Sequence, residues 1–93
     1  MIEESIIHYD LESVVAYCDR RGFKGLAIIY KYDNEIGYLK SLTGAIIGFY
    51  PLYSITTVNK KSLEKLYKEG NINQAKYNKF NDYLTKSNNQ PNN

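Results

Sequence analysis

Residues 25–58 read GLAIIYKYDNEIGYLKSLTGAIIGFYPLYSITTV, the densest run of apolar and aromatic residues in this 93-residue chain. Apolar side chains alternate between residues 26 and 33, which is the period of a half-buried strand. Polar turns and Pro51 then separate further β-rich runs. The pattern predicts strands over 24–33, 36–42, 45–50 and 52–58. The last of these is either a continuation of the third strand past a bulge or a fourth strand.

The residues before this stretch predict a helix over 11–21. Apolar residues fall at i, i+3, i+4 and i+7, which places them on one helical stripe, and they are Leu11, Val14, Val15 and Cys18. Asp10 is suited to the N-cap, and Gly22 to the position that follows a helix C-terminus. Residues 5–9 are expected to form a short strand or an extended lead-in.

The residues after the stretch return to a helical period at Asn59. Gly70 is expected to end a first helix, and Asn73 is expected to cap a second one. The fold class is therefore predicted as α+β, with an N-terminal helix, an antiparallel sheet of three to four strands and a C-terminal helical hairpin. We expect one domain over 1–86, including the hairpin at 59–86, and a disordered polar tail over 87–93.

The charges of the chain are distributed unevenly along the sequence. Residues 1–19 hold five acids and no Lys or Arg, whereas residues 20–93 hold all twelve basic residues and the other five acids. No run of Lys or Arg is longer than two residues. We therefore expect these charges to lie on solvated surfaces rather than to form a nucleic-acid site. The Lys, Ile, Asn and Tyr bias is typical of AT-rich genomes, including those of phages.

The only cysteine is Cys18, so no intramolecular disulfide can form, which fits a reducing cytoplasm. Acids at positions 3 and 4 disfavour a signal peptide. Residues 41–58 carry no charge, but Pro51 and the Ser, Thr and Tyr content favour two short strands over a membrane span. A cytoplasmic protein without a membrane segment is therefore expected.

The sequence contains no arrangement of residues that predicts catalysis. Its only histidine, His8, has no partner at a useful spacing, and Cys18 lies on the predicted apolar stripe, where a buried thiol is the ordinary role. No set of ligands has metal-binding spacing, and no glycine pattern has phosphate-binding spacing. We therefore predict no catalytic residue, no cofactor and no metal, and expect a protein that is not an enzyme.

Nucleic-acid binding is the alternative function. The predicted order of helix, three strands and helix resembles a double-stranded-RNA-binding domain at a coarse level. Tyrosines of the sheet could stack on bases while Lys31 and Lys40 meet phosphates, and the candidates are Tyr30, Tyr32, Tyr38, Tyr50 and Tyr53. Without clustered basic residues, we expect any such binding to be weak and salt-sensitive.

The segment 63–77, LEKLYKEGNINQAKY, is the most specific local pattern. With Leu84 it resembles the SHOCT family, a short helical hairpin near the C-terminus of bacterial and phage proteins; the likeness covers residues 62–85. It departs from that family at Ala75 and Lys76, where acids are usual, and at Phe80, where lysine is usual. The resemblance implies oligomerisation or protein binding without catalysis.

We therefore expect contact with a partner protein, or self-association into a homo-oligomer. The hairpin residues expected to carry that contact are Leu66, Ile72, Tyr77 and Phe80, with Tyr30, Tyr32 and Tyr38 as the sheet residues.

Overall fold

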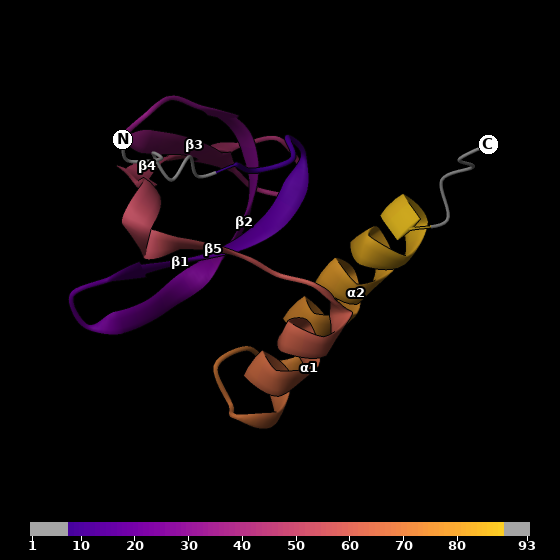
Figure 1. The fold of residues 1–93 in the computed structure, drawn as a ribbon. Helices are drawn as coiled ribbons and strands as arrows, with labels where there is room; N and C mark the ends of the chain where they lie inside the picture. Colours follow the sequence, from indigo (N-terminus) through magenta and orange to yellow (C-terminus); the bar gives the residue numbers. More distant parts are fainter. Residues whose placement is uncertain (1–7, 89–93) are drawn as a thin grey trace, which may run out of the picture. The chain divides into compact units, whose positions relative to one another are not determined.

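The computed structural model describes residues 8–88. The chain divides between Thr57 and Val58 into two compact units, a β-sheet and a helical pair (Figure 1). The first unit has the strands β1 (Ser13–Asp19), β2 (Gly22–Tyr32), β3 (Ile36–Lys40), β4 (Ile46–Pro51) and β5 (Ile55–Thr57), with the 3₁₀-helix η1 (Leu52–Ser54) before β5. The second unit has the helices α1 (Lys60–Lys68) and α2 (Gln74–Asn88). An α+β fold with an antiparallel sheet and a C-terminal helical pair is confirmed.

The helix predicted over 11–21 is wrong, because the chain forms strand β1 there. Val14 and Val15 are both fully buried, so this strand is covered on both faces and its apolar residues show no strand period. The Asp10 carbonyl accepts a bond from the Ser13 hydroxyl at 2.6 Å, so Asp10 lies in a turn and caps no helix. Gly22, with a φ of 109°, serves the turn between β1 and β2.

All five strands are antiparallel, in the order β4-β3-β2-β1-β5. Each strand pairs with the next along the chain up to β4, and η1 then carries the chain back so that β5 pairs with β1. The predicted strand over 52–58 is thus a 3₁₀-helix followed by a short strand. The strand considered over 5–9 lies mostly outside the described residues.

The sheet curls strongly around its core. In a flat sheet, β1 and β4 would lie about 14 Å apart, since two strands separate them and neighbours are spaced by about 4.8 Å. The rings of Tyr17 on β1 and Tyr50 on β4 nevertheless meet at 4.7 Å between centroids. Bulges in three of the four strand pairings contribute, because a bulge bends the strand and increases its twist.

The core of the sheet lies inside this curl. Its buried side chains come from β1, β2, β3, η1 and β5 and from the residues before β1, and they are Tyr9, Val15, Ala27, Ile29, Leu39, Leu52 and Ile55. The Tyr9 hydroxyl donates to the carbonyl of Ile55 at 2.7 Å and to that of Leu52 at 3.2 Å. Burial, and secondarily the neighbouring Tyr32, raise the pKa of Tyr9. Tyr9 therefore connects the residues before β1 to the end of the sheet unit.

The helical pair follows the predicted end signals closely. Asn59 and Ser62 form a reciprocal capping box at the start of α1. Gly70, with a φ of 82°, ends the turn after α1 in a Schellman motif, in which the N–H of Asn71 reaches the carbonyl of Leu66 at 2.9 Å. The Asn73 side chain accepts the N–H of Lys76 at 2.9 Å, so the predicted cap of the second helix is confirmed.

The polar tail was predicted to begin at residue 87. Helix α2 continues through residues 87 and 88, and residues 89–93 lie outside the described part of the chain. Within residues 8–88, no helix has both the length and the hydropathy that a membrane crossing requires.

Candidate functional site

Strand β4 is an edge of the sheet and exposes apolar side chains. Ile46 is 67% exposed and Phe49 is 64% exposed, and the surrounding residues 41–58 contain no charged side chain. Among residues 8–88, β4 has a neighbouring strand only on its β3 side. Natural edge strands usually carry charges that oppose pairing with another chain. β4 lacks them, and this makes its edge a candidate binding site.

The hydrogen bonds next to β4 show which of its backbone groups face the free side. The N–H of Leu52 donates to the carbonyl of Glu35 at 2.9 Å. The backbone groups of Leu52, and those of Tyr50 two residues earlier, therefore point toward β3. Since backbone groups of an antiparallel strand alternate in direction, Phe49 and Pro51 direct theirs to the free side. Pro51 has no N–H, and proline is tolerated in a strand where its nitrogen faces solvent. Phe49 therefore presents both a donor and an acceptor at the edge.

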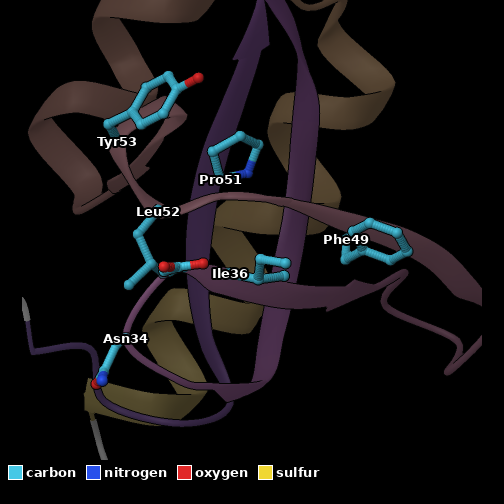
Figure 2. Close-up of a pocket in the computed structure, with 7 residues that line it drawn as sticks. Asn34, Ile36, Phe49, Pro51, Leu52 and Tyr53 are labelled. Carbon is cyan, nitrogen blue, oxygen red and sulfur yellow. The ribbon is translucent and has the colours of Figure 1, made fainter.

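A hollow of about 510 Å³ opens beside this edge, and its floor is apolar. Figure 2 shows Phe49 and Tyr53 toward opposite ends, with Pro51, Leu52 and Ile36 between them. Ile36 and Pro51 are cross-strand partners of β3 and β4, which places them side by side. Helix η1 then turns Leu52 into the core and leaves Tyr53 outside, where it is 88% exposed.

The polar rim of the hollow comes from the turn between β2 and β3, at Asn34 and Glu35. This turn is fixed by Asp33, whose carboxylate accepts the N–H groups of Glu35 and Ile36 at 2.8 Å each. Those two bonds hold the pKa of Asp33 below its ordinary value. The turn, and with it the rim, is therefore held in one conformation at neutral pH.

A second hollow of about 470 Å³ shares Pro51 and Tyr53 with the first. Its other lining residues are Cys18, Asp19, Arg20, Tyr50 and Ser54. Tyr53 thus lies between two largely apolar concave surfaces, one rimmed by Asn34 and Glu35 and the other by Asp19 and Arg20. This arrangement can accommodate side chains on either side of an exposed aromatic ring.

The three tyrosines proposed for the sheet are not brought together. Tyr30 and Tyr38 lie in a row with Phe49, with ring centroids 6.4 Å and 6.1 Å apart. The ammonium groups of Lys40 and Lys31 lie over the rings of Tyr30 and Tyr38, respectively. Tyr32 packs against Tyr9 at the margin of the core, so it takes no part in this row.

The hairpin residues differ in exposure. Ile72 and Phe80 are buried, whereas Leu66 and Tyr77 are half-buried. Tyr77 stacks on Tyr67, with centroids 4.8 Å apart and ring planes inclined by 21°. These contacts lie within the pair of helices.

The lone histidine lies beside Tyr32 and Asp10, and the lone cysteine shares the second hollow with residues of β4. The His8 ring has Nδ1 at 3.3 Å from the Tyr32 hydroxyl and Nε2 at 3.7 Å from a carboxylate oxygen of Asp10. Cys18 is half-buried and lines the second hollow. No group of three or more His, Cys, Asp or Glu side chains converges as a metal site in residues 8–88.

Ile46, Phe49 and Pro51 were not predicted as site residues, and Tyr53 was predicted only as a possible base-stacking residue. Two signals were present: the absence of charge over 41–58, and the exposed aromatics flanking a proline in FYPLY. Neither signal tells which strand is at the edge of the sheet. That depends on β5 pairing with β1, which leaves β4 at the other end.

The two units also differ in charge. Residues 8–57 hold five acidic and five basic side chains, whereas residues 58–88 hold seven lysines and three acids. The basic excess of the chain therefore lies in the helical pair, and the sheet with its aromatic row is neutral.

No family model, no curated protein and no solved structure matches this chain. The likeness of residues 62–85 to the SHOCT family thus has no support beyond the hairpin residues themselves.

Proposed function

We propose that this protein is a non-enzymatic, cytoplasmic protein-binding module that captures an extended segment along the free edge of β4. The observation that carries the proposal is the uncharged edge strand with exposed Phe49 beside an open apolar hollow. An extended segment added to a sheet edge gains main-chain hydrogen bonds, and adjacent hollows select its side chains. The Phe49 N–H and carbonyl supply the main-chain hydrogen-bonding groups. The hollow between Phe49 and Tyr53 supplies the surface that selects a side chain of the captured segment.

The edge is favoured over the hairpin because of what each surface leaves uncovered. Ile72 and Phe80 are already buried, so they offer little apolar area to a partner. Phe49 and Tyr53 are mostly exposed aromatics, the class of side chain that dominates binding energy at protein interfaces. Leu66 and Tyr77 keep a secondary role in this proposal, as half-buried residues of the helical pair.

Site-specific photocrosslinking in the source cells tests the proposal. Phe49 is replaced by a photoreactive phenylalanine analogue in the full-length chain, and the same replacement is made at Leu11 as a control. Leu11 is 55% exposed and apolar but lies outside β4. We expect a discrete adduct from position 49 and none from position 11.

The captured protein is then purified and titrated against wild-type and Phe49→Lys chains. Loss of one aromatic contact at the centre of an interface typically weakens binding by about tenfold or more. Equal affinity of the two chains, or the same adduct from both positions, would refute the proposed site.

Single-stranded nucleic acid is the second candidate, and the row of Tyr30, Tyr38 and Phe49 with its two lysines favours it. Stacked aromatics beside cationic side chains are typical of such surfaces. The neutral charge of residues 8–57 is unfavourable, because phosphate binding needs a basic excess. Fluorescence anisotropy with a single-stranded RNA decides: binding that persists at physiological salt and is lost in Tyr38→Ala would favour this candidate over protein capture.

A further inference from the structure

We propose that the segment captured by β4 is β4 of a second copy, paired antiparallel about a twofold axis at Phe49. The inference rests on the proposed function, because it uses the same free edge. The partner is a second copy, and the register places Phe49 opposite Phe49. Each copy then contributes its five strands to one continuous sheet. A twofold interface requires one surface to be complementary to itself, and β4 meets that condition in its backbone, its charge and its side chains.

The backbone condition is met at one residue. Phe49 directs both its N–H and its carbonyl to the free side, as the bond from Leu52 to Glu35 implies. A residue with both groups facing outward can exchange two hydrogen bonds with the same residue of a second copy. Tyr50 and Gly48 direct their backbone groups toward β3, so neither could exchange hydrogen bonds with the same residue of a second copy on the axis.

The pairing has limits on both sides of the axis. Pro51 lacks an N–H, so one donor is missing toward the C-terminal end of β4. At the other end, Gly48 is opposite Leu39 and Ile46 is opposite Lys40, which makes Ile47 the extra residue of a bulge. The intermolecular ladder is therefore short and centred on residue 49.

The second condition that a second copy must meet concerns charge. A twofold axis places identical residues opposite each other, and identical charges directly opposite destabilise a strand pair. A charged residue on β4 would therefore oppose self-pairing, and residues 41–58 contain none. On the axis, Phe49 would face Phe49 of the second copy, a cross-strand aromatic pair that stabilises strand association.

The exposed apolar area sets the expected strength. Fully covered aromatic side chains bury about 150–250 Å² each, so Phe49 with Ile46 and Ile47 provides a few hundred Å² per copy. A stable interface of standard size buries about 800 Å² per partner. We therefore expect a weak dimer, with a dissociation constant in the micromolar range or weaker.

Sedimentation equilibrium of the full-length chain over a concentration series tests the inference. Wild type is expected to pass from monomer to dimer across the micromolar range. Phe49→Lys and Phe49→Glu are each expected to stay monomeric, because like charges then meet on the axis. An equimolar mixture of these two variants is expected to recover the dimer, because Lys then faces Glu. Leu11→Lys is the matched control and should associate like wild type.

A second readout covers the case in which a charged residue at position 49 disturbs folding. In a Cys18→Ser background, Phe49→Cys places two thiols across the axis, where the backbone spacing of about 5.5 Å suits a disulfide. Mild oxidation should give a covalent dimer, and Leu11→Cys in the same background should give none.

Three results would overturn the inference. The first is a wild type that stays monomeric at several hundred micromolar. The second is a dimer that persists in Phe49→Lys. The third is a mixture of the two charged variants that stays monomeric, together with a Phe49→Cys chain that forms no disulfide. If the wild type stays monomeric but position 49 still photocrosslinks a different protein, the second copy is excluded and the proposed function stands. If neither association nor a Phe49-dependent adduct occurs, both fail.

Discussion

Replacing Tyr9 by Phe removes one hydroxyl from the core of the sheet and leaves the ring in place. That hydroxyl donates to the Ile55 carbonyl at 2.7 Å and approaches the Leu52 carbonyl at 3.2 Å. The Leu52 carbonyl also accepts the N–H of Ile55, so the loss falls mainly on the carbonyl of Ile55. A buried acceptor that loses its donor costs about 1–3 kcal/mol. Because one strong bond is lost, we expect the free energy of unfolding to fall by about 1–2 kcal/mol.

Urea unfolding followed by far-ultraviolet circular dichroism measures this change. With a slope of about 1–2 kcal/mol per molar urea, the midpoint should fall by about 1 M. Tyr53→Phe is the matched control, because Tyr53 is 88% exposed and its loss of a hydroxyl should leave the midpoint unchanged. If Tyr9→Phe matched wild type, or if both variants shifted equally, Tyr9 would not hold the end of the sheet as described.

Gly37→Ala should lower the unfolding free energy by about 1–3 kcal/mol in the same urea assay, because the added Cβ would lie 2.7 Å from the Ile55 side chain; an unchanged midpoint would contradict the close packing. The carboxylate of Asp33 has its pKa lowered by two backbone bonds, so it stabilises the fold above its unfolded pKa of about 3.9 and loses this contribution as the pH falls further. Asp33→Asn should therefore lose less unfolding free energy than wild type as the pH falls below about 4. An equal loss in both chains would contradict the role of the Asp33 carboxylate in the turn. Asn59→Ala should cost about 1 kcal/mol of stability in the helical pair through loss of its capping box with Ser62, seen as a smaller helical signal on heating; equal melting would show that the cap is dispensable.

The helical pair was predictable because its boundaries depend on local chemistry. Asn59 and Asn73 cap helices through their own side chains, and Gly70 adopts the left-handed conformation that ends one. Each of these roles is decided within a few residues, so a sequence pattern contains what is needed.

The segment over 11–21 was not predictable in the same way. Its apolar residues fit a helical stripe, yet the β-branched pair Val14 and Val15 is equally suited to a strand buried on both faces. Gly22 fits a helix end and a hairpin turn alike. The choice was made by pairing with β2 and β5, which the sequence of this segment does not contain.

The candidate site was predicted only in part for a related reason. The exposed residues of β4 follow from strand order, and strand order follows from a contact between β1 and β5 that spans about forty residues. Tyr30 and Tyr38 lie in one row with Phe49, which the sequence alone did not predict. The bulge at Tyr30 shifts the register of β2, so Tyr32 turns to the opposite face and enters the margin of the core.

The tie between Tyr9 and Ile55 also has a consequence for the order in which the two units acquire structure. The contacts that close the sheet join its first residues to its last, so its core is incomplete until the chain through Thr57 is available, although consecutive strands from β1 to β4 can pair earlier. The helical pair depends on neighbours a few residues apart, and such local structure forms in microseconds, whereas sheets with distant contacts take milliseconds or longer. During that interval β4 is uncharged and apolar, and within residues 8–88 its side away from β3 stays unpaired. This makes it the segment of the newly made chain most in need of protection from aggregation.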